Sequence, residues 1–485
     1  MGRIFDAHDQ GAEMSTVVPA EDGAEPASVP ITDVAELWTY FASGEKSRDS
    51  FRIGTEHEKF GFLQKDHRPL PYFGEVSIES LFDAIVNDEH ERGSGPWRRV
   101  QEAGHTIALY KGGATISLEP GGQLELSGAP FSSVYETQAE LDAHLALLRR
   151  VCAPMGVGFV AMGFHPAASR EELPDVPKSR YGIMRSYMPQ KGSRGLDMMK
   201  RTATVQANFD YENEADMVAS FRVGLAVAPI VTALFANSPL VEGRPTGVFS
   251  ERMQIWQDTD DDRAGFPEVV FDADFGYQKW LEYALGVPMY FVRRGTEYLN
   301  YAGADFRDFV AGKLDGHIAT ISDFEDHLTT IFTEVRLKRF LEVRSADSGD
   351  PAFLCALPAL YKALLYDERT REQVWAMMDG PSATELRSFQ RDATRRGFDA
   401  TYRGRSLHSL SEELLDRCRE GLARLASGSG TRDETPFLKV LERCVEARQT
   451  AAETLLERFH TEWGDNISAL WNECDMLRGN GSAIT

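Results

Sequence analysis

Cysteine is scarce in this sequence, and the few cysteines are not arranged for metal binding or for a disulfide framework. The 485 residues include five cysteines, an odd number. Paired spacings such as Cys-x-x-Cys are typical of zinc sites, and none occurs here. We therefore expect reduced, mostly structural thiols, which are Cys152, Cys355, Cys418, Cys444 and Cys474.

Long apolar runs and an excess of basic residues are also missing. Glycine, proline or charged residues interrupt the apolar segments before they reach the roughly 18 residues that a membrane helix needs. With 52 basic and 75 acidic residues, the formal charge is -23. This charge repels the phosphates of nucleic acids and of anionic lipid surfaces. We therefore expect no nucleic acid and no membrane as a partner.

The N-terminus lacks the features of a targeting segment. Residues 1–30 are rich in Ala, Glu, Asp, Gly and Pro, without a basic region followed by an apolar core and too acidic for a transit peptide. This composition predicts a mobile acidic tail, and the cytoplasm is the expected location. A second short tail is predicted at 476–485, which leaves 31–475 as a single domain.

Helix and strand patterns both occur, without regular alternation between them. Period-two alternation predicts strands in six segments, which are 51–62, 106–126, 157–163, 202–209, 288–292 and 339–344. Helical periodicity predicts helices at 32–44, 133–155 and 214–237, and helices dominate after about residue 351. Residues 426–436 are predicted to form an exposed loop. An α+β fold with a mainly antiparallel or mixed sheet follows, because βαβ repeats are absent.

The segment FRIGTEHEKFGF at 51–62 places two glutamates on one face of a predicted strand. Side chains alternate between the faces of a strand, so Glu56 and Glu58 lie side by side. Such like charges repel unless a cation lies between them, and a divalent cation accepts oxygen ligands of this kind. An exposed strand edge with ordinary surface glutamates would show the same pattern.

A second pair of glutamates occurs in TISLEPGGQLELSG at 115–128, where Glu119 and Glu125 share one parity. The Pro-Gly-Gly between them predicts a bend or a bulge instead of an uninterrupted strand. A hairpin with one solvated face would use the same alternation.

A third segment, RLKRFLEVRSAD at 336–347, places Glu342 and Arg344 on one face of a predicted strand. A carboxylate beside a guanidinium suits a site for both metal and phosphate, although a same-face ion pair explains it equally well. Three strands with inward acids favour a metal site, because carboxylates are rarely buried without a partner.

Six segments together resemble the plant-type glutamate–cysteine ligases. They are GTEHEKFGF, ISLEPGGQLELSGAP, RYGIMRSYMP, GLDMMKRTATVQANFDY, LFANSP and TIFTEVRLKRFLEVRSAD. The resemblance extends from about Phe51 to Tyr361. It implies a catalytic ligase domain similar to that of glutamine synthetase, with a curved, mainly antiparallel sheet that forms a funnel-like active site surrounded by helices.

The resemblance also implies the reaction. ATP, glutamate and cysteine would give γ-glutamylcysteine, ADP and phosphate through γ-glutamyl phosphate, as the first step of glutathione biosynthesis. ATP is then a co-substrate, held with two or more Mg²⁺ ions. The absence of a G-x-x-x-x-G-K-[ST] loop agrees with a nucleotide bound through metals. A ligase with another acceptor amine and a non-catalytic relative are the alternatives, and a monomer and a homodimer are both possible.

The matching motifs indicate site residues of three kinds. The expected metal ligands are Glu56, Glu58, Glu119, Glu125, Gln206 and Glu342. The expected catalytic residues, binding glutamate or the transferring phosphoryl group, are Arg201 and Arg344. The expected substrate-binding residues are Met184, Arg185, Tyr187, Asn208, Arg252, Trp256 and Tyr290. Surface charge would also explain Arg185, and core packing would explain Met184, Tyr187 and Trp256.

One property of the plant enzymes is not expected here. They are redox-regulated through disulfides, and Cys355 resembles one cysteine of a regulatory pair. The partner position holds Gln138 in this chain. We therefore expect Cys355 to be a buried small apolar residue.

Overall fold

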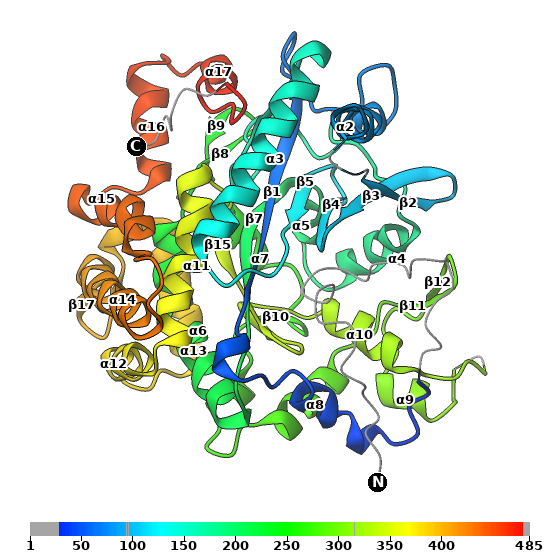
Figure 1. Cartoon of the computed structure of the whole chain (residues 1–485), viewed down its shortest axis with the longest axis vertical. Coiled ribbons are helices and arrows are strands. Elements are labelled where there is room, and N and C mark those ends of the chain that lie inside the picture. Colours follow the sequence, from blue (N-terminus) through cyan, green and yellow to red (C-terminus); the bar gives the residue numbers. More distant parts are fainter. Residues whose placement is uncertain (1–28, 94, 96, 315, 479–485) are drawn as a thin grey trace.

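A nine-stranded sheet runs through the centre of the protein, with helices packed around it (Figure 1). The computed structural model describes residues 29–93, 95, 97–314 and 316–478. Most of the two predicted tails, at 1–28 and 479–485, lies outside the described residues. The division of the chain into one domain with two tails stays a prediction.

Strands far apart in the sequence lie next to each other in this sheet. The order is β14-β15-β7-β1-β5-β4-β3-β2, and β6 pairs with the second half of β1. Neighbouring strands in this order are antiparallel. The strands are β1 (Ile53–Leu63), β2 (Arg98–Glu102), β3 (His105–Lys111), β4 (Ala114–Leu118), β5 (Leu124–Ser127), β6 (Val157–Val160), β7 (Thr204–Phe209), β14 (Val335–Leu337) and β15 (Leu341–Asp347).

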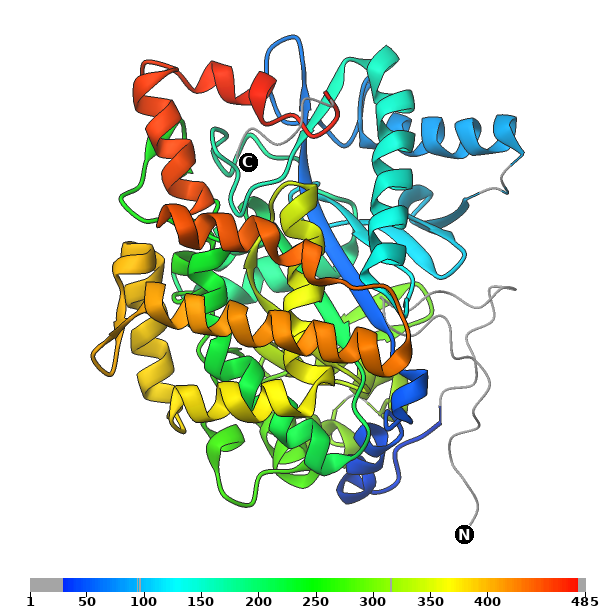
Figure 2. The same ribbon diagram turned by 60° about the vertical axis from the view of Figure 1, so that its left-hand side comes forward.

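Three helices pack on one face of the sheet. They are α3 (Val134–Met155), α6 (Glu214–Leu234) and α11 (Pro351–Tyr366). Further C-terminal helices, α12 (Glu368–Met378), α13 (Ala383–Arg396) and α14 (Leu407–Ser429), lie outside them (Figure 2). Apolar side chains from both helical layers and from this face of the sheet form one continuous core.

The inner helix α6 is apolar on all sides. By length and composition it could cross a membrane, but 83% of its apolar window is buried inside the protein. Asn213 caps its first turn by accepting a hydrogen bond from the backbone N–H of Asp216. A helix enclosed between a sheet and other helices needs no polar face, so burial explains its composition.

A glycine pair allows the turn between β4 and β5 to pack against α5 (Gly195–Arg201). A Cβ atom on Gly121 would lie 2.1 Å from the carbonyl oxygen of Lys200, and Gly122 has a φ of +82°. The Gln123 side chain holds the turn, donating from Nε2 to the carbonyl oxygen of Thr202 at 2.7 Å. The predicted bend is confirmed.

The prediction of an exposed loop at 426–436 is wrong for its first residues, which are helical. α14 continues to Ser429 and ends at Gly430, which has a φ of 66°. Residues 427–430 are exposed, so the helix adds a polar last turn without burying it. Composition alone could not separate this turn from the loop that follows.

Candidate active site

Strand register gathers the predicted glutamates on one face of the sheet. Glu56 of β1 lies opposite Gln206 of β7, and Glu58 lies opposite Glu125 of β5. On β15, Glu342 lies opposite Asn208 of β7. Directly opposed residues in an antiparallel sheet point to the same face. We call this surface the acid face; it comprises Glu56, Glu58, Glu125, Glu342, Gln206 and Asn208.

Three glutamates of the acid face have carboxyl groups that are hard to ionise. Burial raises the pKa of Glu56 to about 7, and repulsion by Glu342 and Glu125 adds to this effect. Burial and repulsion by Glu119 raise the pKa of Glu125 to about 7. Burial also raises the pKa of Glu58 well above its ordinary value. Such clustered acids are typical of a site that binds a cation.

Glu342 has a different environment, because three cations surround it. Arg336 Nη2 lies 2.7 Å from both carboxylate oxygens, Lys338 Nζ lies 3.2 Å from Oε2, and Arg344 donates to Oε1. Burial alone would raise the pKa of Glu342, but these cations hold it well below its ordinary value. Glu342 and Arg344 share a face as predicted, and they also form an ion pair. The role of Glu342 as a metal ligand stays a prediction.

The two amides of the acid face bind neighbouring side chains. Gln206 Oε1 accepts a hydrogen bond from Arg344 Nη1, and Asn208 Nδ2 donates to Glu56 Oε1 at 2.9 Å. The oxygen through which Gln206 would contact a metal therefore has an arginine partner in this structure. Metal coordination by Gln206 and substrate contact by Asn208 stay predictions.

Arg252 reaches the acid face from α7 (Glu251–Trp256). Its side chain is buried, and Nη2 donates to the carbonyl oxygen of Arg344 at 2.8 Å. Nη1 has no hydrogen-bond partner among the described residues. Arg252 also interacts electrostatically with Glu58. It is therefore a cation with an unused donor beside the raised-pKa glutamates.

Arg201 makes its contacts elsewhere. It pairs with Asp197 at 3.5 Å and with Glu242 at 3.3 Å, and it donates to the carbonyl oxygen of Ala168 at 2.9 Å. Its guanidinium carbon lies 4.6 Å from the centre of the Phe164 ring. None of these partners belongs to the acid face, and the catalytic role of Arg201 stays a prediction.

Four of the predicted substrate-binding residues belong to one large apolar cluster, which also contains Ile255 and Phe332. They are Met184, Tyr187, Trp256 and Tyr290. The rings of Tyr187 and Tyr290 are 5.5 Å apart in an edge-to-face arrangement. Arg185, on the same helix α4 (Ser179–Tyr187), pairs instead with the exposed Asp175.

Residues that the sequence analysis did not select also surround the glutamates. Lys178 Nζ and Tyr181 Oη donate to the carbonyl oxygen of Leu118, at 2.8 and 2.9 Å. Burial and Arg180 lower the pKa of Lys178 to about 8, whereas Glu119 and Glu125 oppose this shift. Tyr181 lies within RYGIMRSYMP and Lys178 just before it. The sequence signal for both residues is their polar side chain in or next to a motif shared with the family.

The acid face does not form a complete metal cage. Among the described residues, no group of three or more His, Cys, Asp or Glu side chains is placed to hold one ion. Mg²⁺ commonly uses one or two carboxylates and completes its shell with water and substrate phosphates. The oxygen donors and close pairs of the acid face fit such a shared arrangement.

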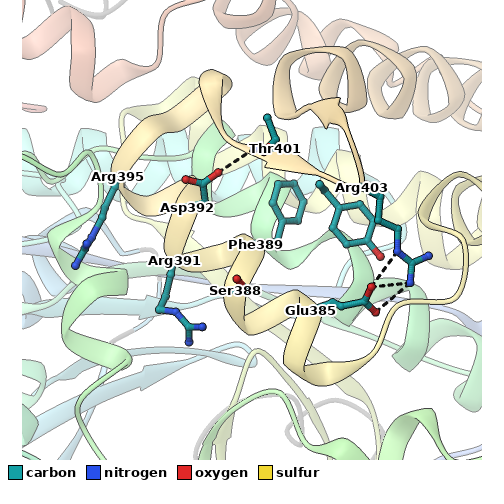
Figure 3. Close-up of a pocket in the computed structure, with 9 residues that line it drawn as sticks. Glu385, Ser388, Phe389, Arg391, Asp392, Arg395, Thr401 and Arg403 are labelled. Atoms are coloured by element: carbon teal, nitrogen blue, oxygen red, sulfur yellow. Dashed lines mark hydrogen bonds and ion pairs between the residues drawn. The ribbon is translucent and has the colours of Figure 1, made fainter.

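A surface cavity elsewhere has a different character (Figure 3). It encloses about 580 Å³ beside α13, and no residue of the acid face lines it. Arg403 bonds to Glu385 across this cavity, and Asp392 accepts a hydrogen bond from the backbone N–H of Thr401. The cavity lacks a row of opposed glutamates, so the acid face is the stronger candidate for an active site.

Comparisons with known proteins show the family to which the chain is similar. Residues 52–473 match the family described as glutamate-cysteine ligase family 2. The chain is 45% identical to the chloroplastic glutamate–cysteine ligase of Medicago truncatula over 94% of this chain and 87% of that relative. It is 42% identical to the chloroplastic glutamate–cysteine ligase A of Oryza sativa subsp. japonica, over 96% of this chain and 92% of that relative.

A solved structure supports the fold. The glutamate–cysteine ligase of Francisella tularensis in complex with AMP aligns with a TM-score of 0.51 at 12% identity, over 90% of each chain. The predicted α+β fold with a mainly antiparallel sheet is confirmed. The predicted cytoplasmic location is wrong, because the curated relatives are named chloroplastic and point to a plastid.

Proposed function

The chain belongs to glutamate–cysteine ligase family 2, and we propose that the acid face is where its substrates react. It is an ATP-dependent ligase that joins glutamate to cysteine in the first step of glutathione synthesis. The observation that carries the assignment of the site is the row of raised-pKa glutamates on adjacent strands beside Arg252 and Arg344. Phosphoryl transfer needs this combination of cation ligands and guanidinium groups.

We assign the binding of Mg²⁺ to Glu56, Glu58 and Glu125, with Glu119 at the edge of the turn. Their oxygens are the ligands that this ion prefers, and their mutual repulsion is relieved by a cation. When bound, Mg²⁺ would neutralise the phosphate oxygens of ATP. Glu342 is already neutralised by three cations, and we propose that it holds Arg344 in place.

The chemistry begins at the side-chain carboxylate of glutamate. This carboxylate attacks the γ-phosphorus of ATP, forming an acyl phosphate and releasing ADP. Acylation of an amine is then possible, because phosphate is a far better leaving group than oxide. The amine of cysteine attacks the carbonyl carbon, the C–O bond to phosphate breaks, and the amine loses a proton as the amide forms.

The protein's own contribution is orientation and charge compensation. Arg252 Nη1 is buried without a hydrogen-bond partner among the described residues, and Arg344 pairs with Glu342; we assign both guanidinium groups to the compensation of anionic substrate groups. Ser117 and Ser127, next to the glutamates on β4 and β5, are buried. His57 faces the opposite side of β1 and packs on His144, with ring centres 5.8 Å apart, so it is not placed as a base.

Product analysis tests the reaction directly. ATP, Mg²⁺ and glutamate are mixed with cysteine, 2-aminobutyrate or alanine in separate reactions, and phosphate release and product mass are measured. We expect cysteine to give the highest kcat/KM and a product with the mass of γ-glutamylcysteine. Faster turnover with another amine would overturn cysteine as the acceptor while leaving the activation step intact.

The raised pKa values predict how Mg²⁺ stabilises the protein at different pH. The folded protein binds protons at Glu56 and Glu125 more tightly than the unfolded chain does, so metal-free protein loses stability as pH rises from 4.5 to about 7. Mg²⁺ competes with these protons. We therefore expect millimolar Mg²⁺ to raise Tm several-fold more at about pH 8 than at about pH 5.5.

Differential scanning calorimetry in the presence of Mg²⁺ or EDTA measures this effect. The Glu56→Gln variant is the control, because it removes one of the two titrating groups and its repulsion. Its Mg²⁺-dependent rise in Tm should be smaller and should vary less with pH. An equal rise at both pH values in the unmodified protein would exclude these carboxylates as the ligands.

A further inference from the structure

Asp347, the last residue of β15, is a buried carboxylate to which no role has been assigned. Its Oδ2 accepts hydrogen bonds from the backbone N–H of Asn237 at 2.9 Å and from Ser238 Oγ at 2.6 Å. Its Oδ1 accepts from Ser250 Oγ at 2.8 Å. A Cβ atom on Gly163 would lie 2.2 Å from the carboxyl carbon, so a glycine is needed there. The carboxylate is enclosed on all sides and 2% exposed.

The two serines connect Asp347 to the first turn of α7. Ser250 is the N-cap of this helix, and its Oγ accepts a hydrogen bond from the backbone N–H of Met253 at 3.1 Å. Ser238 Oγ accepts from the backbone N–H of Arg252 at 3.2 Å. Because each hydroxyl donates its proton to Asp347, each oxygen presents its lone pairs to the helix. The carboxylate therefore fixes the orientation of both hydroxyl groups.

Arg252 is the residue that this network holds in place. Its backbone is bonded to Ser238, and its Nη2 to the carbonyl oxygen of Arg344, which lies on the same strand as Asp347. Its side chain is 2% exposed, yet Nη1 has no partner in the described part of the chain. A buried donor without a partner costs free energy, which a ligand at this position would recover.

We propose that Asp347 is the positioning residue for Arg252. Through Ser238 and Ser250 it fixes α7 so that the unused Nη1 donor meets an anionic substrate group beside Glu58. The inference rests on the proposed function only in giving Arg252 an anionic substrate. Asp347 itself contacts no substrate, so its effect must pass through Arg252.

The test is a double-mutant cycle with full steady-state kinetics. Asp347→Asn keeps the shape of the side chain but presents an amide NH₂ group to at least one donor. We expect kcat/KM to fall about 10- to 100-fold, with the same changes in kcat and in each substrate's KM as in Arg252→Lys. In an Arg252→Ala background, Asp347→Asn should cause less than about a twofold further loss.

Asp475→Asn is the matched control. Asp475 is also a buried acceptor, for the backbone N–H groups of Phe159 at 3.1 Å and Leu477 at 3.0 Å, but it lies far from α7 in the sequence and bonds to none of its residues. This variant should lower Tm without changing any KM. If Asp347→Asn likewise lowers Tm without changing any KM, the proposal is overturned. It is also overturned if Asp347→Asn lowers kcat/KM by about 10- to 100-fold in the Arg252→Ala background as well.

Two outcomes separate this inference from the proposed function. Unchanged kinetics in Arg252→Ala would remove the anionic substrate from Arg252, which overturns the inference and the role of Arg252 in the proposed function but leaves the glutamates of the acid face as the site. A large loss in Arg252→Ala with normal kinetics in Asp347→Asn would overturn the inference alone. If Asp347→Asn does not fold, the Ser238→Ala and Ser250→Ala variants break the two links separately, and their combination should reproduce the Arg252→Lys pattern.

Discussion

Replacing Glu56 by glutamine is expected to lower kcat/KM by on the order of 10²- to 10³-fold and to stabilise the metal-free protein. The amide is a weaker ligand for a divalent cation, so phosphoryl transfer loses charge compensation. At the same time the neutral side chain no longer repels Glu342 and Glu125, which help to raise the pKa of Glu56 to about 7. Steady-state kinetics and thermal unfolding in EDTA near pH 8 measure the two effects.

A matched control separates the loss of a ligand from the loss of a buried charge. Burial raises the pKa of Glu140, on α3, to about 7 as well, and its carboxylate accepts a hydrogen bond from the backbone N–H of Ala129 at 3.0 Å. Glu140→Gln should therefore stabilise the protein in the same way while keeping normal turnover. Full activity in Glu56→Gln, or equal losses in both variants, would refute the assignment of Glu56.

Replacing Arg336 by methionine is expected to destabilise the fold by about 3 kcal/mol or more. Glu342 is fully buried, and the substitution removes its bidentate partner, whose Nη2 lies 2.7 Å from both oxygens. It also leaves the carbonyl oxygens of Thr329 and Ile331 without donors now at 2.6 and 2.8 Å. Urea unfolding monitored by tryptophan fluorescence measures the change.

The corresponding control lies at the surface. Arg403 also forms a bidentate pair, with Glu385 at 2.8 and 3.0 Å, but both side chains are more than a third exposed. Solvent screens this pair, so Arg403→Met should cost less than about 1 kcal/mol. Similar losses in the two variants would show that burial does not set the strength of the Glu342 pair.

Much of the sheet and the position of the acids could be predicted from the sequence. Alternation in β1 placed Glu56 and Glu58 on one face, and the glycines after Glu119 indicated a turn. These features are local, since strand periodicity and turn geometry depend on neighbouring residues. The resemblance to glutamate–cysteine ligases then supplied the reaction, which no local pattern specifies.

What the sequence could not provide is the pairing between distant segments. Glu58 and Glu125 are adjacent only because β1 pairs with β5, and Arg252 reaches them only because α7 returns to β15. The surroundings of Glu342 likewise depend on the hairpin that places Arg336 opposite it. The chloroplastic names of the relatives contradict a location inferred from the missing leader pattern, because composition of a short segment is weak information about targeting.

The central position of β1 has a consequence for how the gene can vary. This strand pairs with β7 over residues 53–57, with β5 over 56–59 and with β6 over 60–63, and its two faces carry different side chains. A one-residue slip of β1 against its neighbours would exchange Glu56 and Glu58 with His57 and Lys59, turning a histidine and a lysine toward the substrates and glutamates into the apolar core. We therefore expect selection to remove insertions and deletions within β1 even at positions where it tolerates substitutions.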